Sequence, residues 1–315
     1  MQLQIFKKQG DKLVQVEKIE PGCWINIAPP FNQDELQGVS EELGIPFDFI
    51  ADSLDIDERS RYEHDEDADL ILINTPVKNK GYTPVEASFV TVPVGIISKP
   101  DFIVTVCRYN NPVIGKLITG QKVSNPEDQS EFALKLFDLN NFYFLYYLKE
   151  LNNLRNEFEK ELYNSSRNQE LANLLNIQKS LVYFLTNLRS NELMMMKMQR
   201  TDFLKIKDDE EKSDLYEDIL IDTSQALEMA EVYTRILNGT LETFASIISN
   251  NLNMVMRRLT AVTIILMVPT LLASYYGMNV DLPLDENPNA FPMIFGASIL
   301  FSIALTWFFL KKRWF

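Results

Sequence analysis

Two long apolar segments near the end of the sequence restrict its fold more than any other feature. Residues 259–275 and 293–310 contain no Asp, Glu, Lys, Arg or His. Segments of about 17–18 residues are close to the minimum for a helix that crosses a membrane. A buried helix of a soluble protein is the alternative, but two such segments in succession are hard to fit into one soluble core. The sequence therefore predicts two transmembrane helices.

The charges beside these segments predict their orientation. Arg257 and Arg258 precede the first segment, and a basic tail, residues 311–315, follows the second. The loop between them, residues 277–292, carries only acidic charges: Asp281, Asp285 and Glu286. Because basic flanks stay on the cytoplasmic side, we expect both termini inside the cell and the loop outside the plasma membrane.

The rest of the chain is strongly acidic. The net charge is −14, and residues 257–315 hold five Lys/Arg and three Asp/Glu, which leaves −16 for residues 1–256. Such a domain suits cations and is a poor partner for nucleic acid. With two cysteines and one histidine, the chain lacks the residues for a His/Cys zinc site or a disulfide framework. It also lacks phosphate-loop, dinucleotide and hydrolase motifs, so we do not expect an enzyme.

Residues 1–124 have the pattern of an α/β domain. Short β-branched or aromatic runs alternate with helical segments. The expected strands are 3–6, 13–16, 24–27, 70–75, 88–97 and 102–107, and the expected helices are 33–43, 46–51 and 112–119. Residues 55–69 contain eight acidic side chains and are predicted to form a solvated loop or helix face, with a cation site as the alternative.

Residues 125–256 are expected to be helical, since residues 127–268 contain one glycine and no proline. Asn125 is predicted to cap the first helix, with Pro126 at its first position. The expected helices are 126–163, 167–205 and 213–276. The last would be about 95 Å long. It would begin as a cytoplasmic stalk, 213–256, and continue as the first membrane span, 257–276.

One face of that span is more polar than the others. Its residues recur at spacings of three and four, as one helix face does. They are Asn253, Met256, Thr260, Thr263, Met267, Thr270 and Ser274. Because two helices cannot enclose a pore, a channel would need several copies of the chain around this face. Alternatively, the hydroxyls bond to backbone carbonyls. The second span, with Ser298, Ser302 and Thr306, is better suited to packing on the first.

The absence of ionisable groups from both spans favours passage of a hydrated ion. A carboxylate is the usual ligand where a transporter binds a dehydrated cation inside the membrane. Mg²⁺ loses its water reluctantly. Neutral oxygens, such as the amides of Asn279 at the outer end and Asn253 at the inner end, can accept hydrogen bonds from its water shell.

The end of the chain resembles the CorA magnesium transporters. The shared features are Tyr276-Gly277-Met278-Asn279 between the two spans, the run at 249–260 and the basic end at 311–315. The resemblance implies a homopentamer with an α/β cytoplasmic funnel, long helices and two C-terminal transmembrane helices. It further implies Mg²⁺ uptake, with Co²⁺ and Ni²⁺ as further substrates. The partners would be other copies of the chain, membrane lipid and divalent cations.

The resemblance also assigns roles to individual residues. Gly277, Met278 and Asn279 would form the outer selectivity element. The family's pore constrictions would fall on Asn253, Met256, Leu259, Met267 and Thr270. Two departures stand out: Val268 separates Met267 from Pro269, and the loop acids are displaced to Asp285 and Glu286.

The family is gated by Mg²⁺ bound between cytoplasmic domains. Asp218 aligns with the carboxylate on the stalk helix, but the partner loop contains Lys78 and Lys80 and no acidic side chain. The two-carboxylate site is therefore not intact, and substitutes would be Asp65, Glu66, Asp67 and Glu86. Alternatively, the lysines replace the metal by a direct salt bridge.

Two other functions stay open at this point. One is transport of Zn²⁺ on the same fold, because the two hydrated ions have similar size and charge. The other is a membrane-anchored scaffold that conducts no ions.

Overall fold

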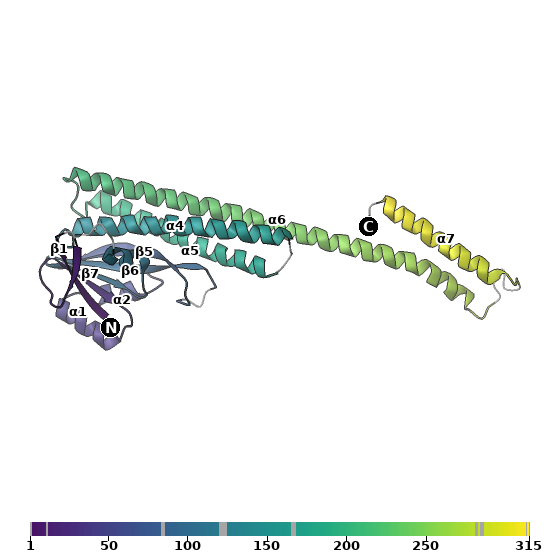
Figure 1. Ribbon diagram of the computed structural model, residues 1–315, viewed down its shortest axis with the longest axis horizontal. Coiled ribbons are helices and arrows are strands. Elements are labelled where there is room, and N and C mark those ends of the chain that lie inside the picture. The colour runs from purple at the N-terminus through teal and green to yellow at the C-terminus, as the bar shows by residue number, and fades with distance from the viewer. Residues whose placement is uncertain are drawn as a thin grey trace. The chain divides into compact units, whose positions relative to one another are not determined.

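The computed structural model describes residues 2–10, 12–82, 86–119, 125–164, 168–280, 283, 287–312 and 314. The chain forms two compact units, Met1–Asn238 and Gly239–Phe315. Helix α6 (Glu210–Tyr276) contributes its first part to one unit and its remainder to the other (Figure 1).

The first unit is built on one mixed sheet of seven strands in the order β2-β1-β3-β7-β6-β5-β4. Strands β3 and β7 are parallel, and every other neighbouring pair is antiparallel. The strands are β1 (Gln2–Gln9), β2 (Lys12–Val16), β3 (Cys23–Ala28), β4 (Arg61–Asp65), β5 (Ala68–Lys78), β6 (Phe89–Lys99) and β7 (Phe102–Cys107).

Helices cover both faces of the sheet (Figure 1). Side chains alternate along β3, so Trp24 packs on one face while Cys23 and Ile25 pack on the other. Helices α1 (Gln33–Leu43) and α2 (Phe47–Leu54) cover the second face. On the first face the core is formed with α3 (Pro112–Thr119), α4 (Gln129–Asn164) and α5 (Asn168–Thr201), and Tyr216 and Ile219 from the first turns of α6 join the same core. The predicted α/β domain followed by long helices is thereby confirmed.

The predicted start of α4 is wrong by three residues. Asp128 caps this helix in place of Asn125, because its Oδ1 accepts the Glu131 N–H at 3.0 Å. Its other oxygen accepts a hydrogen bond of 2.6 Å from Lys212 Nζ on α6. Partial burial raises the pKa of Asp128, but the hydrogen bonds from Lys212 and Glu131 outweigh it and hold that pKa below its usual range.

The acidic segment at 55–69 also differs from the prediction, because residues 61–65 form strand β4 at the edge of the sheet. Arg61 makes this possible by balancing the local negative charge. It forms ion pairs with Asp52 at 2.6 Å and with Glu58 and Glu63. Charged side chains are a common feature of edge strands, where they discourage pairing with another molecule.

The long helices are close to their predicted limits. Helix α5 ends at Thr201, four residues early, where Asp202 Oδ1 accepts the N–H groups of Ile206 and Lys207. Helix α6 then runs for 67 residues, and α7 (Ala290–Lys311) for 22. By length and composition, α6 and α7 can each cross a membrane. Only 6% and 11% of their apolar windows are buried, which is unlike the core helix of a soluble protein.

Candidate functional site

Helix α7 packs along one face of the membrane part of α6. The covered side of α6 carries Ala261, which is buried, and Ile265, Val268 and Leu272, which are half-buried. The matching side chains of α7 are Ile294, Ser298, Ser302, Leu305 and Phe309. Ser302 Oγ donates to the backbone oxygen of Ile265 at 3.4 Å. The prediction that the serines of the second span pack on the first is confirmed for Ser298 and Ser302.

The predicted polar stripe lies on the opposite side of α6. With 3.6 residues per turn, its members are about half a turn away from the covered face. All seven members are exposed in the second unit: Asn253, Met256, Thr260, Thr263, Met267, Thr270 and Ser274. Leu259, the constriction residue that the family resemblance implies, is exposed as well. Leu259 and Met267 have 59% and 64% of their surface free. The stripe is therefore available to other copies of the chain.

The threonine hydroxyls of this stripe donate to carbonyls of their own helix. Thr260, Thr263 and Thr270 each bond at 2.9 Å to the carbonyl four residues earlier. This agrees with the alternative interpretation of the stripe, in which the hydroxyls form hydrogen bonds with backbone carbonyls. It does not remove their capacity to interact with an ion, because each oxygen keeps lone pairs that can accept a hydrogen bond from water.

The Gly277-Met278-Asn279 motif begins where α6 ends. The Gly277 N–H donates to the carbonyls of Ala273 at 3.0 Å and Ser274 at 3.3 Å. A Cβ at position 277 would lie 3.3 Å from the Ala273 oxygen, a backbone atom that cannot easily shift. A larger residue at position 277 would therefore need this part of the backbone to move by a few tenths of an ångström.

Asn279 extends from this turn with its amide exposed. Within the described part of the chain its side chain makes no hydrogen bond, so both its oxygen and its NH₂ group are available to ligands or water. The loop acids Asp281, Asp285 and Glu286 lie outside the described residues.

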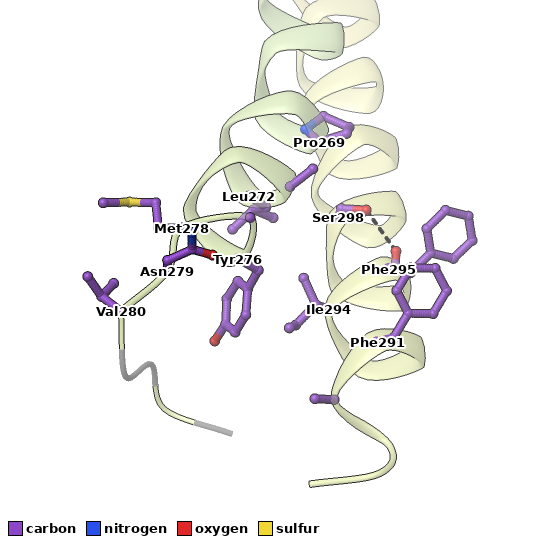
Figure 2. Close-up of a pocket in the computed structure, with 13 residues that line it drawn as sticks. Pro269, Leu272, Tyr276, Met278, Asn279, Val280, Phe291, Ile294, Phe295 and Ser298 are labelled. Atoms are coloured by element: carbon purple, nitrogen blue, oxygen red, sulfur yellow. Dashed lines mark hydrogen bonds between the residues drawn. The ribbon is translucent and has the colours of Figure 1, made fainter. Parts of the chain in front are cut away.

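A cavity of about 810 Å³ separates the C-terminal end of α6 from the N-terminal end of α7 (Figure 2). Its lining is mainly apolar and includes Leu272, Tyr276, Ile294 and Phe295. The Tyr276 hydroxyl donates to the Pro283 carbonyl at 3.0 Å, which joins the end of α6 to the loop beyond the motif.

Aromatic side chains mark both ends of the two apolar helices. Tyr275 and Tyr276 lie at the C-terminal end of α6, while Trp307 lies near the basic end of α7. The Lys311 amine lies 5.1 Å from the Trp307 ring centre. Tyrosine and tryptophan with nearby lysine are typical of the interfaces between a membrane and water.

The candidate regulatory residues do not form a metal site within the described chain. Asp218 is exposed on α6, and none of the described His, Cys, Asp and Glu side chains form a group of three that could hold an ion. Lys78 Nζ pairs with Glu150 of the same chain at 2.7 Å. Two of the substitute acids pair with lysines: Asp67 with Lys99 at 3.0 Å and Glu86 with Lys179 at 3.9 Å.

The sequence matches the family described as CorA-like Mg²⁺ transporter protein over residues 21–313. The chain belongs to the CorA family. It is similar to a cobalt/magnesium transport protein CorA of Methanocaldococcus jannaschii, with 27% identity over 92% of this chain and 90% of that protein. CorA family members are ion transporters and not enzymes, as the sequence motifs predict.

Solved structures show the same fold. The complete CorA magnesium transporter from M. jannaschii superimposes with a TM-score of 0.83, covers 99% of this chain and 98% of that one, and is 24% identical. The cytoplasmic domain of ZntB from Vibrio parahaemolyticus superimposes with a TM-score of 0.59, covers 79% of this chain and 97% of that one, and is 14% identical. The CorA resemblance and fold class predicted from the sequence are confirmed, and the protein is a membrane protein of this family.

One pair of functional interest was missed by sequence reasoning: Ser302 and the Ile265 carbonyl. A signal for it exists. Pro269 removes the N–H that would bond to that carbonyl four residues earlier, and a hydroxyl on the neighbouring helix is the simplest replacement.

Proposed function

We propose that the chain forms a homopentameric channel for Mg²⁺ influx through the plasma membrane, with Co²⁺ and Ni²⁺ as further substrates. Both termini lie in the cytoplasm, and the loop at 277–292 lies outside. The observation that carries the proposal is the exposed stripe of α6 on the side away from α7, which leads to the motif at Asn279. Placing five such stripes around an axis leaves each α7 on the outside, against lipid.

In this proposal residues 1–124 are the α/β part of a cytoplasmic funnel, and residues 125–256 are its helical part. Residues 257–276 line the pore as the first transmembrane helix, and residues 293–310 form the second. Residues 311–315 return the chain to the cytoplasm, where basic side chains meet anionic lipid headgroups.

The pathway offers neutral oxygens and apolar constrictions to a hydrated ion. Asn279 and Asn253 provide amide oxygens at its two ends, and Thr263 and Thr270 provide hydroxyl oxygens between them. These groups bind the water shell of Mg²⁺ and spare the cost of removing it. Met256, Leu259 and Met267 form apolar rings that close the pathway by excluding water.

Ion flux into liposomes tests this function. The full-length protein is reconstituted, an inside-negative potential is applied, and uptake of Mg²⁺, Co²⁺, Ni²⁺ and Zn²⁺ is compared with that of empty liposomes. We expect Mg²⁺ uptake above that of Zn²⁺. Preferential Zn²⁺ uptake would instead support a zinc transporter, for which the fold shared with ZntB is an argument. A properly assembled oligomer with no flux would support a non-conducting scaffold.

Intracellular Mg²⁺ closes this channel in our proposal. Close packing of five cytoplasmic domains brings many carboxylates together, since residues 1–256 carry −16. Bound Mg²⁺ relieves their repulsion and so favours a compact, closed arrangement. Asp218 is the candidate ligand because its carboxylate is exposed on α6. Lys78 is already paired with Glu150 of its own chain, so a direct salt bridge from Lys78 to a neighbour would require that pair to break.

Limited proteolysis tests this regulation. We expect millimolar Mg²⁺ to slow cleavage of the wild-type oligomer and to have little effect on Asp218→Lys. Glu217→Lys is the matched control, because Glu217 is also an exposed acid and occupies the adjacent position of α6. Loss of protection in both variants would mean that charge alone is responsible. Equal cleavage of the wild type with and without Mg²⁺ would exclude the regulatory site.

A further inference from the structure

Pro269 leaves a backbone acceptor without its helical partner inside the membrane part of α6. In a regular helix the N–H of residue 269 would donate to the carbonyl of Ile265, but proline has no N–H. In hydrocarbon no water replaces the lost donor, and an unpaired carbonyl is costly there. The Ile265 carbonyl therefore needs one hydrogen-bond donor from outside the regular helix pattern.

Helix α7 supplies that donor through Ser302. Its Oγ lies 3.4 Å from the Ile265 oxygen, a long hydrogen bond compared with the usual distance of about 2.5–3.0 Å between two oxygens. The other hydroxyls of α7 donate to backbone carbonyls of α7 itself: Ser298 to that of Phe295 at 2.8 Å and Thr306 to that of Ser302 at 2.7 Å. Pro269 itself lies on the side of α6 that faces α7 (Figure 2). The proline and the serine that compensates for it thus meet at one contact between the two spans.

We propose that Ser302 is a positioning residue that fixes the direction of α6 beyond Pro269. A proline interrupts the hydrogen bonds that hold successive turns in line, so the segment after it can change direction. That segment, residues 270–276, is about two turns long and carries Gly277-Met278-Asn279. The Ser302 bond joins α7 to the carbonyl before the break, and α7 also covers Leu272 beyond it, so α7 bridges the break and holds the motif at one place. This role rests on the proposed function, because the position of the motif affects ion passage only if the chain forms a channel.

A double-mutant cycle isolates the interaction. Ser302→Ala, Pro269→Ala and the double variant are prepared in the full chain and compared for thermal stability in detergent and for Mg²⁺ influx. Ser302→Ala removes the donor, whereas Pro269→Ala restores an N–H for Ile265 within α6. Interhelical hydrogen bonds in membranes average about 0.6 kcal/mol, or roughly threefold in an equilibrium. We therefore expect Ser302→Ala to lower stability in the Pro269 background and to have little effect once Pro269 is replaced.

Two further variants separate positioning from mere packing. Ser302→Thr keeps the hydroxyl and is expected to retain wild-type influx. Thr306→Val, the matched control, removes a hydroxyl that bonds only within α7 and is expected to leave influx unchanged. Ser302→Ala should also alter the half-saturating Mg²⁺ concentration or the ratio of Mg²⁺ to Co²⁺ uptake by about threefold, which a purely structural role would not.

These experiments can separate failure of the Ser302 proposal from failure of the proposed channel function. If the wild type carries no ions, the stability cycle alone still tests the bond. Equal destabilisation by Ser302→Ala in both backgrounds would overturn the pairing with Ile265. The positioning role would be overturned if the effects of Ser302→Ala and Pro269→Ala on stability are coupled but Ser302→Ala leaves ion uptake and selectivity unchanged.

Discussion

Replacing Asn279 with alanine is expected to reduce Mg²⁺ influx by about tenfold or more while leaving the assembled oligomer intact. The amide is exposed at the end of α6 and makes no hydrogen bond within the described chain, so its removal should not disturb the fold. A hydrogen bond between neutral groups is worth about 0.5–1.5 kcal/mol. In the proposed pentamer five subunits each lose one such bond to the ion's water shell, which accounts for the expected reduction, and the influx is measured in liposomes.

Asn279→Asp should also impair influx, for a different reason. A ring of carboxylates would hold a divalent ion too strongly to release it. The matched control is Asn289→Ala, because Asn289 is an exposed asparagine of the same loop whose side chain makes no capping bond to α7. Near-normal Mg²⁺ influx in both Asn279 variants would remove Asn279 from the selectivity element.

Leu259→Asn is expected to raise basal Mg²⁺ influx by about tenfold and to weaken its inhibition by internal Mg²⁺. Leu259 is 59% exposed on α6, between Met256 and Thr263 of the polar stripe. Transfer of a leucine side chain out of water is favourable by about 1.5–3 kcal/mol. For the same reason a ring of leucines excludes water from a narrow pore. An amide at this position admits water and lowers the barrier. Influx with and without Mg²⁺ inside the liposomes measures both effects.

Val262→Asn is the control for a polar side chain at this depth of the membrane. Val262 is exposed on α6 but is not part of the stripe. A similar increase of influx in Val262→Asn would attribute the effect to general disturbance of the helix. Unchanged influx and unchanged inhibition in Leu259→Asn would place the gate elsewhere.

The membrane part of the fold could be predicted because its signals are local. Absence of charge over residues 259–275 and 293–310 fixes the spans. The lack of proline between Pro126 and Pro269 allows the continuous helix α6. The Gly277-Met278-Asn279 motif at the end of the penultimate helix was sufficient to identify the family that the sequence comparison confirms.

The features that were missed depend on partners distant in the sequence. Asp128 outcompetes Asn125 as the cap of α4 because Lys212, 84 residues away, also bonds to its carboxylate. Residues 61–65 of the acidic segment form a strand because the edge of β5 is free to pair with them and Arg61 balances the nearby carboxylates. The sequence predicts that Ser302 packs on the first span, but the particular acceptor of its hydroxyl, the Ile265 carbonyl, becomes clear only from the structure.

Cadmium block of introduced cysteines tests most directly whether the stripe of α6 lines the ion pathway. The native thiols should not respond, because Cys23 and Cys107 are buried. Burial also raises the pKa of Cys107 to about 11, and only a thiolate binds metal well. Thr263→Cys places a thiol on the stripe, and Val268→Cys places one on the face covered by α7. We expect Cd²⁺ to block Mg²⁺ influx through Thr263→Cys and to leave Val268→Cys and the wild type conducting. Block of Val268→Cys with continued influx through Thr263→Cys would contradict the assignment of the pore.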